Sequence, residues 1–124
     1  MSRRRAWKDT RVLVTGASSG LGRAIAERLV QLGATVVLTG RSAARLDALS
    51  SELERGGAAP DRIISVAADL TIEADRDRLF EVVERRLGAL DLVVNNAGVG
   101  ATGQFDTHEP SVLRRVFEIN FFAM

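Results

Sequence analysis

The glycine-rich segment Thr15-Gly16-Ala17-Ser18-Ser19-Gly20-Leu21-Gly22 could bring main-chain N–H groups close to a phosphate. The apolar, β-branched run before it, 11–15, predicts a buried strand. From Leu21 onward the apolar residues take helical spacing, and Gly33 is placed to end a helix over 20–32. A helix N-terminus aims free N–H groups and a positive dipole end at an anion. The order strand, glycine turn, helix therefore predicts a dinucleotide phosphate site, with a purely structural turn as the alternative.

A second motif, Asn95-Asn96-Ala97-Gly98, follows the apolar run 90–94. With T-G-x-x-x-G-x-G after the first strand, it makes the chain resemble the amino-terminal half of the short-chain dehydrogenase/reductase family. The resemblance implies that the first asparagine ties neighbouring strands together, and the alternative is an ordinary turn after a strand. It also implies that these two segments bind the cofactor, through Thr15, Gly16, Ser18, Ser19, Gly20, Leu21, Gly22, Asn96, Ala97 and Gly98.

Arg41 bears on which dinucleotide is bound. Relatives that prefer NAD carry an acidic residue at the end of the second strand, where it takes the ribose hydroxyls. Here that strand ends Leu38-Thr39-Gly40-Arg41, without a carboxylate. A guanidinium can hold a 2′-phosphate through paired hydrogen bonds, and Gly40 leaves room for it. We therefore expect NADP(H) rather than NAD(H); the alternative is a solvent-exposed arginine at a helix start.

Further site residues follow from the resemblance. Asp69, with Leu70 beside it, matches an aspartate that accepts a hydrogen bond from the adenine amino group; a local turn or helix cap is an equal alternative. Asn120 matches an asparagine that helps to hold a water in a proton relay. No metal site is expected, because the chain has no cysteine and a single histidine, His108.

The acid–base residues of the family are missing from the chain. The family uses a Tyr-x-x-x-Lys pair and a serine on the carbonyl or alcohol, whereas this sequence has no tyrosine and its lone lysine is Lys8. We expect the cofactor-binding half of an NADP(H)-dependent oxidoreductase for a small-molecule carbonyl or alcohol, inactive by itself. The alternative from another functional class is a non-catalytic nucleotide-binding or scaffold module.

Alternating strand and helix patterns predict an α/β fold, a Rossmann-type doubly wound parallel sheet. We expect this sheet to stop after strand four, with strand order 3-2-1-4. Residues 1–10 are expected to be a basic flexible start, and 11–124 a partial dinucleotide-binding domain. Thr71 could cap the third helix, and a fourth helix is expected from about residue 109. The predicted strands are 11–15, 35–39, 63–67 and 90–95; the predicted helices are 20–32, 43–55 and a third that ends before Gly88.

Composition excludes some partners. The formal net charge is +1, which favours neither a nucleic-acid nor a membrane surface. No apolar stretch approaches the roughly 20 residues of a membrane span, and no signal peptide is visible. We therefore expect a cytoplasmic protein, and the resemblance leaves a homo-oligomer open.

Overall fold

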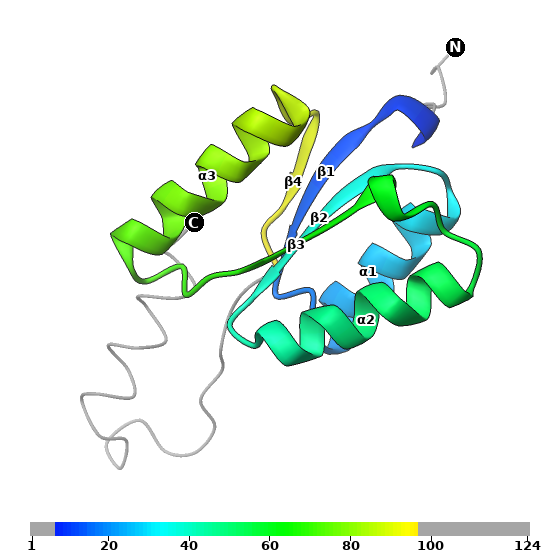
Figure 1. The fold of residues 1–124 in the computed structure, drawn as a ribbon, viewed down its shortest axis with the longest axis horizontal. Helices are drawn as coiled ribbons and strands as arrows, with labels where there is room; N and C mark the ends of the chain where they lie inside the picture. Colours follow the sequence, from blue (N-terminus) through cyan, green and yellow to red (C-terminus); the bar gives the residue numbers. More distant parts are fainter. Residues whose placement is uncertain (1–6, 97–124) are drawn as a thin grey trace, which may run out of the picture.

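All four strands of the sheet run parallel, and the computed structural model describes residues 7–96 (Figure 1). The strand order is β3-β2-β1-β4, which confirms the predicted 3-2-1-4 topology. In register, Val12 of β1 lies between Val36 of β2 and Leu92 of β4. The bounds are β1 Arg11–Thr15, β2 Thr35–Gly40, β3 Ile63–Ala67 and β4 Leu92–Val94.

Helices cover both faces of the sheet. Figure 1 shows α1 and α2 on one face and α3 on the other. The helices are α1 Gly20–Gln31, α2 Ala43–Arg55 and α3 Glu73–Leu87, and short 3-10 turns occupy Trp7–Asp9 and Pro60–Arg62. Of the segment that we expect to be a flexible start, Trp7 packs against the core and Thr10 is buried.

The core is split between the two faces because successive strand residues point to opposite sides of the sheet. Val12 and Val14 of β1 pack with α1 and α2, whereas Leu13 packs with α3. The central strands β1 and β2 are buried on both faces, as is usual for parallel sheets. This explains why their sequences are nearly continuous apolar runs rather than alternating ones.

Two local predictions are corrected by the structure. Strand β4 is shorter than the predicted 90–95, because the backbone and side chain of Asp91 instead join the start of β1: Asp91 N donates to Arg11 O (2.9 Å), and Arg11 N donates to Asp91 Oδ2 (2.8 Å). Thr71 does not cap α3. The N-cap is Ile72, without a side-chain cap, because the Thr71 hydroxyl donates to Asp69 Oδ1 (2.6 Å) instead.

Candidate functional site

The glycine loop lies between β1 and α1, at the carboxyl end of the sheet. Gly16 (φ 64°) and Gly20 (φ 58°) adopt left-handed backbone conformations, which disfavour any residue with a Cβ. Ala17 N donates to Thr39 O (3.1 Å), so the loop is tied to the end of β2. Ser19 is the N-cap of α1 in extended geometry, and its side chain makes no cap hydrogen bond. The first N–H groups of α1 therefore have no side-chain cap.

Gly22 is pressed against the same loop. A Cβ at this position would overlap Gly16 O and the Asn96 side-chain amide. Only glycine lets the first turn of α1 come so close to both the loop and the residue that follows β4. Leu21, next to it, is 67% exposed, so the helix start carries an apolar side chain toward solvent.

Asn96 joins β4 to the glycine loop. Asn96 Nδ2 donates to Gly16 O (3.3 Å), and Asn96 N donates to Thr15 Oγ1 (2.9 Å). Thr15 Oγ1 in turn donates to Val94 O (3.2 Å). The family resemblance implies this tie for the first asparagine of the motif, but Asn95 is exposed, and among residues 7–96 the hydrogen bonds to Thr15 and Gly16 come from Asn96. Both asparagines follow the last residue of β4, Val94, and of the two it is Asn96 whose side chain reaches the carbonyl of Gly16.

The end of β2 lies beside the glycine loop. A Cβ on Gly40 would be 3.2 Å from Ser18 Oγ, so this crossing also favours glycine. Ser42 is the N-cap of α2, and its hydroxyl accepts from Arg45 N (3.2 Å). The Arg41 side chain is exposed, and within residues 7–96 it takes part in no ion pair.

The three helix starts differ in charge. Neither α1 nor α2 has an acidic residue in its first turn, whereas α3 has Glu73 and Asp75 there. Carboxylates at a helix N-terminus satisfy its dipole and repel a further anion. The ends of β1 and β2 are therefore suited to phosphate groups, and the end of β3 is not.

Asp69 follows β3 and forms a local turn. Its Oδ1 accepts from Thr71 N (3.0 Å) and from the Thr71 hydroxyl, so the structure contains the local alternative that the sequence left open. Leu70 is half-buried, and its side chain packs against the core cluster under α3. Three other predicted site residues, Ala97, Gly98 and Asn120, lie outside the described residues.

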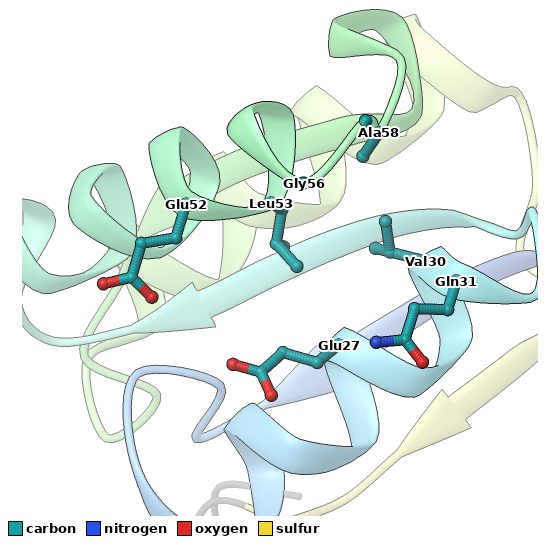
Figure 2. A pocket seen from close by; sticks show the side chains of 8 residues that line it. Glu27, Val30, Gln31, Glu52, Leu53, Gly56 and Ala58 are labelled. Carbon is teal, nitrogen blue, oxygen red and sulfur yellow. The ribbon is translucent and has the colours of Figure 1, made fainter.

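A separate groove of about 320 Å³ lies between the C-terminal halves of α1 and α2, at the opposite end of the sheet from the glycine loop. Figure 2 shows Glu27 and Glu52 on its two sides. Arg23 forms ion pairs with both carboxylates, and its pKa is raised by the hydrogen bond to Glu27 and by the charge of Glu52. This groove lies beside an ion pair that joins α1 to α2, and none of its lining residues belongs to the glycine loop.

The described part of the chain contains neither a candidate metal site nor a candidate membrane span. Between residues 7 and 96, no group of three or more histidine, aspartate or glutamate side chains is arranged to hold a metal ion. Over the same residues, no helix is both long enough and apolar enough to cross a membrane.

Known proteins resemble the chain along most of its length. A family model described as "short chain dehydrogenase" matches residues 10–124. Farnesol dehydrogenase from Aedes aegypti is 35% identical over 119 residues, which is 95% of this chain and 48% of that protein. The chain thus spans about half the length of this relative.

Solved structures agree in fold. A metagenomic short-chain oxidoreductase in complex with NADP is 36% identical, with a TM-score of 0.82 over 92% of this chain and 51% of its own. A 3-ketoacyl-(acyl-carrier-protein) reductase from Brucella melitensis, complexed with NADH, is 33% identical, with a TM-score of 0.84 over 94% of this chain and 46% of its own.

Proposed function

The chain belongs to the short-chain dehydrogenase family, and we propose that it is the cofactor-binding half of an NADP(H)-dependent oxidoreductase that interconverts a carbonyl and an alcohol. The chain has no tyrosine, and Lys8 is its one lysine. In this proposal the family's Ser and Tyr-x-x-x-Lys groups come from a part of the parent protein outside these residues, and the chain alone does not turn over substrate.

The glycine loop would hold the pyrophosphate. Its two left-handed glycines and the uncapped start of α1 present main-chain N–H groups without an acidic residue in the first turn. Such an arrangement suits a diphosphate because the helix dipole and the N–H groups act together. The close packing of Gly22 supports this proposal, because it holds the loop so near to the first turn of α1 that a side chain at position 22 would overlap Gly16 O.

Arg41 is the observation that carries the preference for NADP(H). It follows β2 directly, is exposed, and has no carboxylate partner among residues 7–96. It also precedes the start of α2, where Ser42 is the cap and no acidic residue occupies the first turn. A guanidinium beside such a helix start favours a 2′-phosphate, whereas free ribose hydroxyls would donate hydrogen bonds to an acidic residue at this place.

The adenine and nicotinamide ends of the dinucleotide would be held by the residues that follow β3 and β4. We assign the adenine amino group to the carboxylate of Asp69, with Leu70 beside the ring. We assign the nicotinamide side to the segment Asn96-Ala97-Gly98, and the proton relay of the parent enzyme to Asn120. When bound, the cofactor supplies or accepts the hydride; the described residues bind it and fix its orientation.

The cofactor preference is tested by titrating the purified protein with NADPH and with NADH, followed by fluorescence. Arg41→Asp should raise the Kd for NADPH by at least about tenfold, because a charge-assisted hydrogen bond contributes about 1.5–3 kcal/mol. The Kd for NADH should change much less. Arg55→Asp makes the same charge change in the last turn of α2 and should leave both constants near their starting values. An unchanged preference in Arg41→Asp would refute the assignment.

A further inference from the structure

Side chains of α3 hold the main chain of the loop that follows β3. Asp75 Oδ2 accepts from Asp69 N (2.8 Å), and Arg76 Nη1 donates to Leu70 O (2.6 Å). Arg78 donates to Ala67 O and is also paired with Asp75 (3.5 Å). Three residues from the first two turns of α3 thus bind two main-chain groups of the loop and the main-chain oxygen of the last residue of β3.

The same loop is held from its other side. Ala68 N donates to Gly40 O (2.8 Å), which joins the loop to the end of β2. Within the loop, Asp69 Oδ1 accepts two hydrogen bonds from Thr71, and Asp69 O accepts from Ile72 N (3.0 Å). Both the main chain and the carboxylate of Asp69 therefore have a fixed direction before any ligand arrives.

Asp75 is unusual in where it makes its hydrogen bond. A carboxylate in the first turn of a helix commonly accepts from the free N–H groups of that turn. Asp75 instead accepts from a residue six positions earlier, outside the helix, while Ile72 serves as an N-cap without a side-chain bond. Glu73, in the same turn, is exposed, and among residues 7–96 its side chain makes no hydrogen bond or ion pair. The two acids of this turn therefore differ in their contact with the loop.

We propose that Asp75, assisted by Arg76, is a positioning residue for base recognition: it holds the main chain of Asp69 so that the carboxylate meets the exocyclic amine of adenine. This inference rests on the proposed function, in which Asp69 receives the adenine end. Preorganisation of this kind lowers the ordering cost of binding, and its loss is felt at the base rather than at the phosphates.

The test compares NADPH with its hypoxanthine analogue, deamino-NADPH, which has a carbonyl in place of the adenine amine. The unmodified protein should bind NADPH more tightly. Asp75→Ala should raise the Kd for NADPH by about 3- to 10-fold and the Kd for the analogue much less, so that discrimination between the two falls. Asp75→Asn keeps an oxygen that can accept from Asp69 N and should restore discrimination. Glu73→Ala, the matched control, should retain it.

Each outcome has a distinct meaning. Equal weakening of both ligands in Asp75→Ala, or undiminished discrimination, would overturn the positioning role. If Asp75→Ala does not fold, Arg76→Met removes the bond to Leu70 O and must lower discrimination in the same way, or the inference fails. Binding of NADPH without discrimination in the unmodified protein would overturn both the adenine assignment and this inference, but not the NADP(H) site itself. Failure to bind either dinucleotide would overturn the proposed function.

Discussion

Replacing Gly22 with alanine tests whether the close approach of α1 to the glycine loop is essential. The added Cβ would meet the main-chain oxygen of Gly16 and the amide of Asn96, and the first of these cannot rotate away. Overpacking of this kind costs about 1–3 kcal/mol, and a clash with backbone belongs at the upper end of that range. The better helix propensity of alanine returns up to about 1 kcal/mol. We therefore expect a net loss of about 2 kcal/mol in the free energy of unfolding.

Urea denaturation measures this loss. With a slope of about 2 kcal/mol per molar, the urea midpoint should fall by about 1 M. The Kd for NADPH should rise in parallel, because the shift that relieves the clash displaces the N–H groups of the loop. The matched control is Gly56→Ala, where φ is −77° and the nearest atoms lie 3.4 Å or more from the new Cβ. A Gly22→Ala protein with unchanged midpoint and unchanged NADPH affinity would refute the reasoning.

Two further substitutions probe the hydrogen bonds between strands. Asn96→Ala removes the amide that donates to the glycine loop, and it should lower the free energy of unfolding by about 1 kcal/mol and weaken NADPH binding. The control, Asn95→Ala, should change stability by less than about 0.5 kcal/mol. Equal effects of the two variants in urea denaturation and in NADPH titration would contradict the assignment of this hydrogen bond to the second asparagine. Thr39→Val removes a fully buried hydroxyl that donates to Val66 O (2.7 Å), and it should lower the free energy of unfolding by about 1–2 kcal/mol. The control is Thr35→Val, at a half-buried position of the same strand. Similar urea midpoints for the two variants would count against a stabilising hydrogen bond at Thr39.

The elements of the fold were predictable because their signals are local. The bounds of β1, α2 and β3 match the predicted ranges, since the two strands are short apolar runs and the helix is an amphipathic segment that begins after Ser42 and ends before Gly56. Strand β4 was predicted too long because the pattern of apolar residues does not show that Asp91 pairs with Arg11, eighty positions away. Register between distant strands is a property of the assembled sheet, and no local pattern contains it.

The site was predictable at its loops but less so in its contacts. The motif predicted a tight glycine loop with Gly16 and Gly22 at fixed places, and the structure gives the physical reason for glycine there: positive φ at Gly16, and no room for a Cβ at Gly22. It did not show which asparagine reaches the loop. It also gave no indication that Asp75 contacts the loop after β3, because an acid in a first helical turn is explained equally well by the helix dipole.

The sequence by itself indicated the family, through the resemblance of its two motifs. It also indicated the parallel sheet and the strand ends at which a dinucleotide could lie, because glycine spacing and apolar patterns act over a few residues. Only the tertiary structure decided which side chains meet across those strand ends: Asn96 on the loop after β1, Ser18 against Gly40, and Asp75 on the main chain of Asp69. Such contacts depend on how strands alternate and how helices lie on the sheet. They are fixed only when segments far apart in the chain are packed together.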